Sequence, residues 1–183
     1  LYCIWDPSVF MESLPFLEAA VISFSFGMLF KLIMKVRPGA PITVQEGAII
    51  VFFAWVCGIV FSALPFIFGG YLNFTQAIFE STSGLTTTGL TMVDVLTIPD
   101  TYLLWRSILQ FIGGAGFAII MMSAILGPTG LGLYKAEGRM DNLVPNIKSS
   151  TRTIAVIYTT YAVAGILMYK IAGMNWFDAL NHS

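Results

Sequence analysis

Residues 79–91 read FESTSGLTTTGLT, a hydroxyl-rich stretch with two glycines that lies between two long uncharged runs of the chain. These runs, residues 47–72 and 107–134, are each longer than the roughly 20 residues that a helix needs to cross a bilayer. A polar stretch between two crossings indicates irregular backbone at membrane depth, which is tolerated only where it is buried in protein or lines water. We therefore expect residues 79–91 to be a special segment of a membrane protein, not a further crossing.

The composition agrees with a membrane protein. Of the 183 residues, 57% are hydrophobic and 10% are charged, whereas soluble domains carry about 25% charged residues. These values exclude an ordinary soluble enzyme, a disordered chain and a basic nucleic-acid binder, and the net charge of −1 suggests no nucleic-acid partner. Cys3 and Cys57 are the only cysteines, so neither a disulfide framework nor a cysteine metal site is expected.

The predicted fold is an all-α, multi-pass integral membrane protein embedded in the lipid bilayer. Its unit is a repeat of a helix, a re-entrant pore helix with a filter loop, and a second helix, with one additional transmembrane helix on the N-terminal side. The predicted segments are a leading transmembrane helix within 1–36, a first pore repeat at 37–134 (helix 44–72, pore helix and filter 73–92, helix 103–126), a cytoplasmic loop at 135–150, and the start of a second pore repeat at 151–183. The short pore helix is expected at 73–80, with Asn73 as its N-cap. Asp178 is expected at the start of the second pore helix, where its charge suits the helix N-terminus.

Basic residues predict the orientation. They flank two connections: Lys31, Lys35 and Arg37 lie at the first, and Lys135, Arg139, Lys148 and Arg152 at the second. The connection at 73–102 contains acidic residues and no Lys or Arg. Because cytoplasmic loops carry the excess of Lys and Arg, the two basic connections are expected in the cytoplasm. Residues 73–102 then start and end outside, as a re-entrant segment does.

An internal sequence similarity, called the echo below, supports the repeat. Asn73 and Ala77 recur as Asn175 and Ala179, at an offset of 102 residues, and each pair follows a predicted crossing. Ser81 recurs at the same offset as Ser183. Matched sequence in matched topology indicates an internal repeat. We expect the chain to be a fragment that stops at the opening of the second copy.

Residues 86–90 have the composition of a cation filter. Backbone carbonyls and Thr hydroxyls can replace the water around a cation without the full charge that would trap it. Gly89 permits dihedral angles that turn carbonyls toward an ion, and the C-terminal end of a preceding half-helix favours a cation. The alternative is an exterior loop whose hydroxyls bond nearby backbone. A single such strand supplies a quarter of a ring.

The stretch at 79–91, with LWRS at 104–107 and QFIGGAG at 110–116, resembles the Trk/Ktr/HKT superfamily of potassium transporters. ALPF at 63–66 and WFDALNH at 176–182 also fit, and the leading helix favours the TrkH/TrkG branch over the KtrB branch. The resemblance implies four repeats around one pore, a homodimer of the full-length membrane subunit, a cytoplasmic nucleotide-binding regulatory subunit (TrkA-like), and a place in the cell inner membrane.

The resemblance also implies site residues. Gly89 would be the first filter glycine, Thr87 and Thr88 would supply oxygens that face potassium, and Leu90 would add a carbonyl. Potassium is then the one ion bound, with no other metal site. Whether transport is channel-like or a symport with protons or sodium stays open.

Glu80 and Arg106 are predicted to support the filter. Arg106 is expected either to pair with Glu80 or Asp100 and brace the re-entrant loop, or to be an interfacial arginine that reaches water. Alternatively, Glu80 lies in the outer vestibule of the pore, where its charge would attract cations.

Two other function classes differ from potassium transport in the residues that they require. An intramembrane enzyme needs a nucleophile with a base, or a metal cluster, and the apolar stretches provide neither, so no enzyme is expected. A non-conducting structural or partner-binding membrane subunit is the alternative to potassium uptake. Four chains could also form a ring by symmetry, but the start of a second repeat argues against it.

Overall fold

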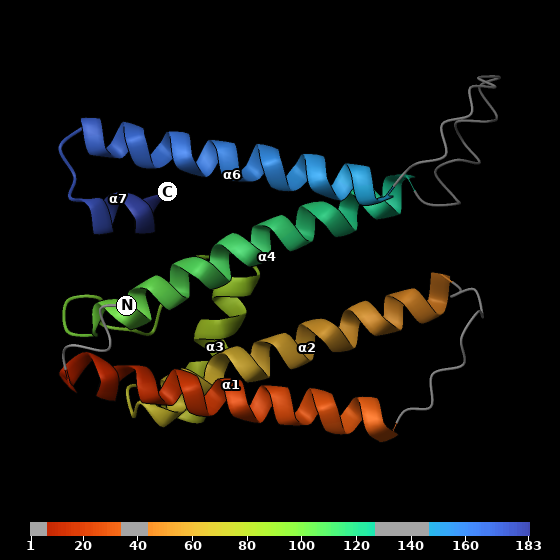
Figure 1. The fold of residues 1–183 in the computed structure, drawn as a ribbon, viewed down its shortest axis with the longest axis horizontal. Coiled ribbons are helices and arrows are strands. Elements are labelled where there is room, and N and C mark those ends of the chain that lie inside the picture. Colours follow the sequence, from red (N-terminus) through yellow and green to blue (C-terminus); the bar gives the residue numbers. More distant parts are fainter. Residues whose placement is uncertain (1–6, 34–43, 127–146) are drawn as a thin grey trace. The chain divides into compact units, whose positions relative to one another are not determined.

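The computed structural model describes residues 7–33, 44–126 and 147–183. Within these ranges the chain is helical and contains no strand. The helices, drawn in Figure 1, are α1 (Pro7–Ile33), α2 (Val44–Phe68), α3 (Phe74–Leu85), α4 (Asp100–Leu126), α6 (Ile147–Ile171) and α7 (Trp176–His182). The chain divides into two compact units, Leu1–Leu109 and Gln110–Ser183, which are described separately.

Three helices in the described part of the chain are long and apolar enough to cross a membrane. They comprise Met11–Ile33, Gln45–Phe68 and Arg152–Ile171. Large apolar side chains project from them into the surroundings: Phe24 and Met168 are each 71% exposed. Exposed apolar surface on this scale is unfavourable in water and suits lipid. The protein is therefore an all-α membrane protein.

The predicted third crossing, 103–126, lies within α4, which has 27 residues. Side chains beyond Gly116 in this helix lie outside the described residues, so the crossing stays a prediction. The predicted turn at 37–41 and most of the predicted cytoplasmic loop at 135–150 also fall outside the described residues.

The core of the first unit lies where α2, α3 and α4 meet. Ala63 and Phe66 of α2, Ala77 of α3 and Tyr102 of α4 have no exposed surface. Burying a large apolar side chain such as Phe66 stabilises the fold by about 1.5–3 kcal/mol. The core therefore holds the predicted re-entrant segment against the helices on either side of it.

Tyr102 is the centre of an aromatic cluster that joins α1, α2 and α4. Its ring centroid lies 4.9 Å from that of Phe16, 4.6 Å from that of Tyr71 and 5.7 Å from that of Phe66. One turn further along α4, Trp105 donates its indole N–H to the backbone carbonyl of Ser62, at 3.1 Å. Rings at these separations attract one another beyond simple burial.

The helix expected at 44–72 ends at Phe68. Gly70, with φ of 71°, adopts the left-handed conformation that stops a helix, and the amide of Tyr71 donates to the carbonyl of Phe66 at 3.2 Å. Leu72 therefore lies beyond the helix, where its side chain joins the core. Only the last four residues of the prediction were wrong.

The short helix α3 starts as expected and runs further than expected. Asn73 accepts a hydrogen bond from the amide of Gln76, and the Gln76 side chain accepts one from the amide of Asn73. The expected end was Glu80, whereas the helix continues to Leu85. The hydroxyls of Thr82 and Thr86 each donate to the carbonyl one turn earlier, at 2.7 Å, and so remain compatible with helix.

In the second unit, α6 begins at Ile147, four residues before the expected position 151, and ends at Ile171. The last residues of the predicted loop 135–150 are thus helical. α7 packs against α6, and the hydroxyl of Ser183 donates to the carbonyl of Ala162 at 2.6 Å.

The two units share a local structure at the predicted echo. A glycine with positive φ ends the long helix in each: Gly70 in the first and Gly173, with φ of 102°, in the second. Asn73 and Asn175 then cap the short helices with nearly the same dihedral angles. As expected, Asp178 lies in the first turn of α7, where its charge complements the helix N-terminus.

Candidate ion-binding loop

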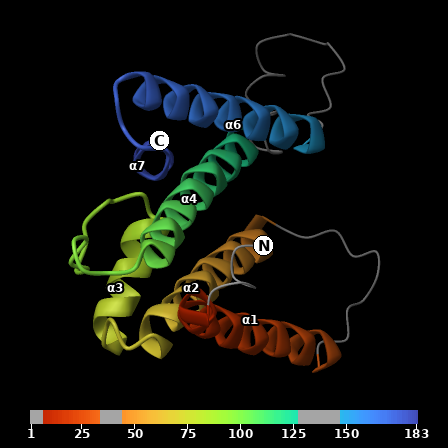
Figure 2. The same cartoon turned by 60° about the vertical axis from the view of Figure 1, so that its left-hand side comes forward.

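The loop 86–99 leaves the C-terminal end of α3 and returns to the start of α4 (Figure 2). Two of its residues adopt the left-handed conformation, Thr87 with φ of 56° and Gly89 with φ of 79°. Among the described residues, Thr87 is the one non-glycine with positive φ. This conformation costs a residue with a Cβ about 1–2 kcal/mol, so the surrounding contacts must impose it.

Three consecutive amides impose that turn. The amide of Thr86 donates to the carbonyl of Thr82, at 2.9 Å, and the amides of Thr87 and Thr88 donate to carbonyls of the last helical turn at 3.0 and 2.9 Å. A trans peptide is planar, and its C=O points opposite to its N–H. The carbonyls of Thr86 and Thr87 therefore point away from α3.

The outward groups of this turn suit a cation. In the described part of the chain, the carbonyl oxygens of residues 86–89 accept no hydrogen bond, and they lie at the partly negative C-terminal end of α3. The amides of Thr86, Thr87 and Thr88, which would attract an anion, are already used within the turn.

The Leu90 carbonyl has a partner of its own. The hydroxyl of Ser83, a buried residue of α3, donates to this oxygen at 2.6 Å. The side chain of Leu90 is 60% exposed. A carbonyl oxygen has two lone pairs, so one acceptor position of Leu90 is left. Ser83 thus joins the end of the glycine turn to the helix.

Glu80 anchors the returning part of the loop. The residue is 2% exposed, and its carboxylate accepts hydrogen bonds from the amide of Met92, at 2.8 Å, and from the hydroxyl of Thr91, at 3.0 and 3.1 Å to the two oxygens. Arg106 of α4 forms an ion pair with the same carboxylate. A buried carboxylate is stable only with such partners.

These contacts decide between the alternatives expected for Arg106 and Glu80. Arg106 pairs with Glu80, and Asp100 is exposed at the first turn of α4. Glu80 lies buried between α3, α4 and the loop, so its carboxylate is not an open vestibule charge in this structure.

Thr87, Thr88 and Gly89 lie together at the exposed start of the loop. The Thr88 hydroxyl is 2.8 Å from the hydroxyl of Thr86, and the Thr86 hydroxyl donates to the carbonyl of Thr82 at 2.7 Å. The hydroxyl that contacts Thr88 is thus that of Thr86, which was not among the predicted site residues.

Sequence reasoning missed the parts played by Ser83, Thr86 and Thr91. Ser83 lies three residues after Glu80 and shares its helical face, so its burial beside Glu80 had a readable signal, whereas its bond to Leu90 had none. Thr91 had none, because its bond to Glu80 joins residues eleven positions apart, across the end of α3 and an irregular turn.

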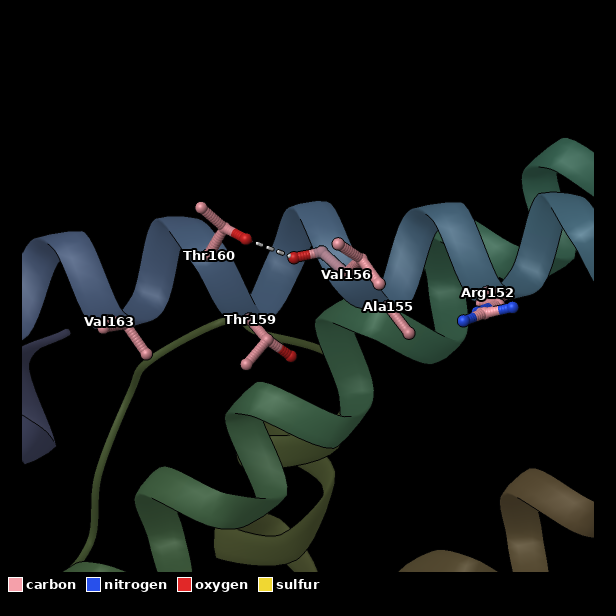
Figure 3. Close-up of a pocket in the computed structure, with 6 residues that line it drawn as sticks. All are labelled: Arg152, Ala155, Val156, Thr159, Thr160 and Val163. Atoms are coloured by element: carbon pink, nitrogen blue, oxygen red, sulfur yellow. Dashed lines mark hydrogen bonds between the residues drawn. The ribbon is translucent and has the colours of Figure 1, made fainter.

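A separate cavity of about 500 Å³ lies along α6 (Figure 3). Its lining comes from Arg152, Ala155, Val156, Thr159, Thr160 and Val163. The Thr160 hydroxyl donates to the carbonyl of Val156, at 2.7 Å, so its proton is used within the helix. Across the described ranges, no group of three or more His, Cys, Asp or Glu side chains is placed to hold a metal ion. The loop 86–99 remains the candidate site.

Comparison with protein families matches residues 14–183 to the TrkH family, whose description is "Cation transport protein". The chain belongs to the TrkH family. This family transports cations and is not an enzyme family, and the membrane character of the chain agrees with it.

Curated relatives of this TrkH-family chain carry names that refer to potassium. The chain is 37% identical over 155 residues to Trk system potassium uptake protein TrkG of Escherichia coli (strain K12), an alignment that covers 80% of this chain and 32% of TrkG. It is 41% identical over 149 residues to TrkH of the same strain, with 76% and 31% covered. It is 38% identical over 148 residues to TrkH of Halomonas elongata, with 76% and 31% covered. The chain spans about a third of the length of these relatives.

Proposed function

We propose that this TrkH-family chain contributes one quarter of a potassium filter to a potassium-uptake protein of the cell inner membrane. The observation that carries the proposal is the turn at Thr87, which directs consecutive carbonyl oxygens away from α3. The names of the relatives support potassium as the transported ion. Potassium is then cargo and not a resident cofactor.

In this proposal the re-entrant segment is residues 73–92, with α3 as the pore helix. Residues 37–134 form the first pore repeat, preceded by the leading crossing within 1–36. Residues 135–150 lie in the cytoplasm, and 151–183 open a second repeat. The similar turns at Gly70 and Gly173 and the similar caps at Asn73 and Asn175 support the repeat.

The ion is held by oxygen dipoles in the proposed site. Thr87 and Gly89 provide backbone carbonyls, Thr88 adds its hydroxyl, and Leu90 adds the acceptor position that Ser83 leaves open. Glu80 and Arg106 do not touch the ion. They hold the returning chain so that the oxygens keep their places when water is stripped from the ion.

One strand cannot surround a cation, so the remaining oxygens must come from further filter strands. We propose that these belong to later repeats of the same transporter. By resemblance, the full-length membrane subunit forms a homodimer and binds a cytoplasmic nucleotide-binding regulatory subunit. The basic connections are the expected cytoplasmic face for that partner.

The test uses the full-length transporter and replaces Gly89 by Ala. Nothing lies within 4 Å of the added Cβ, but φ of 79° strains any residue other than glycine. The change therefore alters the direction of the filter carbonyls without a steric clash. We expect the preference for potassium over sodium, measured as uptake in potassium-depleted cells and in proteoliposomes, to fall strongly.

The matched control is Gly70→Ala. Gly70 also has positive φ and open space at its Cβ, but it lies at the end of α2 and outside the loop. Its variant suffers a similar strain, so any loss of protein from the membrane is shared by the two. Unchanged selectivity and flux in Gly89→Ala would overturn the filter assignment and favour a structural part for residues 86–90. Absence of any potassium flux through the wild-type full-length protein would instead favour a non-conducting subunit.

A further inference from the structure

We propose that Thr86 is a positioning residue that turns the lone pairs of the Thr88 hydroxyl toward the transported cation. The inference rests on the proposed function, because it concerns how one oxygen of that filter is oriented. It assigns a part to a side chain that contributes no ligand to the ion.

The argument follows the single proton of each hydroxyl. The Thr86 hydroxyl lies 2.7 Å from the carbonyl oxygen of Thr82, which can only accept, so the Thr86 proton points there. The Thr86 and Thr88 hydroxyl oxygens are 2.8 Å apart, and one of them must donate. Because the proton of Thr86 is already used, the donor is Thr88.

Thr86 is itself fixed by two hydrogen bonds to one carbonyl oxygen. Its backbone amide and its hydroxyl both donate to the carbonyl of Thr82, at 2.9 and 2.7 Å. These two bonds use both lone pairs of that carbonyl oxygen. The side chain of Thr86 is thereby fixed in one orientation, and the position of its oxygen toward Thr88 is fixed with it.

The consequence is a fixed orientation of the Thr88 hydroxyl. With its proton turned toward Thr86, the Thr88 oxygen presents only lone pairs on its remaining sides. A monovalent cation is attracted by such an oxygen, whereas an anion is repelled. Without Thr86, the Thr88 hydroxyl rotates freely, so its lone pairs no longer face the ion from the fixed place that a filter needs to prefer potassium to the smaller sodium.

The experiment replaces Thr86 by Val in the full-length transporter. Valine keeps the shape of threonine and lacks the hydroxyl. We expect the preference for potassium over sodium to fall about tenfold, which corresponds to ~1.4 kcal/mol. Thr86→Ser retains the hydroxyl and is expected to restore most of the preference.

The matched control is Thr82→Val. The Thr82 hydroxyl also donates to a carbonyl one turn earlier, that of Ile78 at 2.7 Å, but does not contact Thr88. The two variants therefore lose the same kind of helix hydrogen bond, and only one of them releases Thr88. The preference in Thr82→Val should stay at the wild-type value.

A double variant separates orientation from a merely structural part. If Thr86 acts through Thr88, Thr86→Val has no further effect on selectivity in a Thr88→Val background. An equal loss in both backgrounds would overturn the inference. Should Thr86→Val abolish uptake, Thr86→Ala is measured in the same two backgrounds.

The outcome is distinguishable from a failure of the filter itself. If Gly89→Ala lowers the preference while Thr86→Val leaves it unchanged, the filter stands and the inference on Thr86 is wrong. If both variants keep wild-type selectivity, the proposed function fails. Selectivity is a ratio of two fluxes, so it does not depend on the amount of protein in the membrane.

Discussion

The buried carboxylate of Glu80 in α3 is bound by the partly exposed Arg106 of α4, so an ion pair joins the two helices that flank the loop 86–99. The same carboxylate holds the amide of Met92. One side chain thus connects α3, the returning loop and α4. The filter proposed above depends on this arrangement, because oxygens that select an ion must keep fixed positions.

Glu80→Gln is expected to weaken the loop. The amide side chain carries no charge, and it leaves Arg106 without its ionic partner. Breaking a buried pair by removing one member is destabilising by about 3–5 kcal/mol, and because Arg106 is partly exposed we expect the lower end of that range or less. Thermal unfolding of the purified full-length protein in detergent measures the change.

The control for this change is Asp94→Asn, because Asp94 is an exposed acid of the same loop. It should unfold within about 0.5 kcal/mol of the wild type, as surface substitutions do. A melting temperature of Glu80→Gln equal to that of Asp94→Asn would contradict the anchoring described here.

Ser83→Ala is expected to release the Leu90 carbonyl. Losing this hydrogen bond lowers the free energy of unfolding by about 1 kcal/mol and frees the end of the glycine turn. We also expect a lower preference for potassium over sodium. Melting curves and uptake assays on the same variant report the two effects.

Ser81→Ala is the matched comparison. Ser81 is also buried in α3, and within the described residues its hydroxyl has no hydrogen-bond partner. Removing an unsatisfied buried hydroxyl should leave stability unchanged or raise it slightly. Equal effects of the two substitutions would show that the bond from Ser83 to Leu90 contributes nothing.

Thr87→Gly is expected to stabilise the protein. Relief of the left-handed conformation gains about 1–2 kcal/mol, and the greater freedom of glycine in the unfolded chain removes about 0.5–1 kcal/mol of that gain. The backbone carbonyl is kept, so ion uptake should persist. A fall in melting temperature would mean that the Thr87 side chain supplies more stability than its conformation removes.

Gly69→Ala is expected to disrupt the aromatic cluster. A Cβ at this position would overlap the hydroxyl of Tyr102 and lie 3.0 Å from the ring of Tyr71. Overpacking of this kind destabilises by roughly 1–3 kcal/mol. Gly47→Ala serves as the control, since nothing lies within 4 Å of its Cβ.

A double variant, Gly69→Ala with Tyr102→Phe, tests the cause of that loss. Among the described residues the Tyr102 hydroxyl has no hydrogen-bond partner, so its removal alone should be tolerated. The double variant should recover part of the lost stability, because the hydroxyl that overlaps the new Cβ is gone. If the double variant recovers no stability, the strain in Gly69→Ala does not come from the Tyr102 hydroxyl.

The sequence by itself determined the features that depend on neighbouring residues. Long apolar runs predicted membrane-crossing helices, because hydropathy needs no knowledge of the fold. The cap at Asn73 was readable because a capping side chain bonds a backbone amide only three residues away. The pairing of Arg106 with Glu80 was one of three expectations, beside pairing with Asp100 and a place at the membrane interface.

Only the tertiary structure decided where α3 ends and how the loop is held. The serine and threonine residues at 81–83 are compatible with either helix or loop, and packing extends the helix to Leu85. The left-handed Thr87 follows from three amides bonded to the last helical turn, against the preference of a residue with a Cβ. The bonds from Ser83 to Leu90 and from Glu80 to Met92 depend on the path of an irregular chain, which no local pattern specifies.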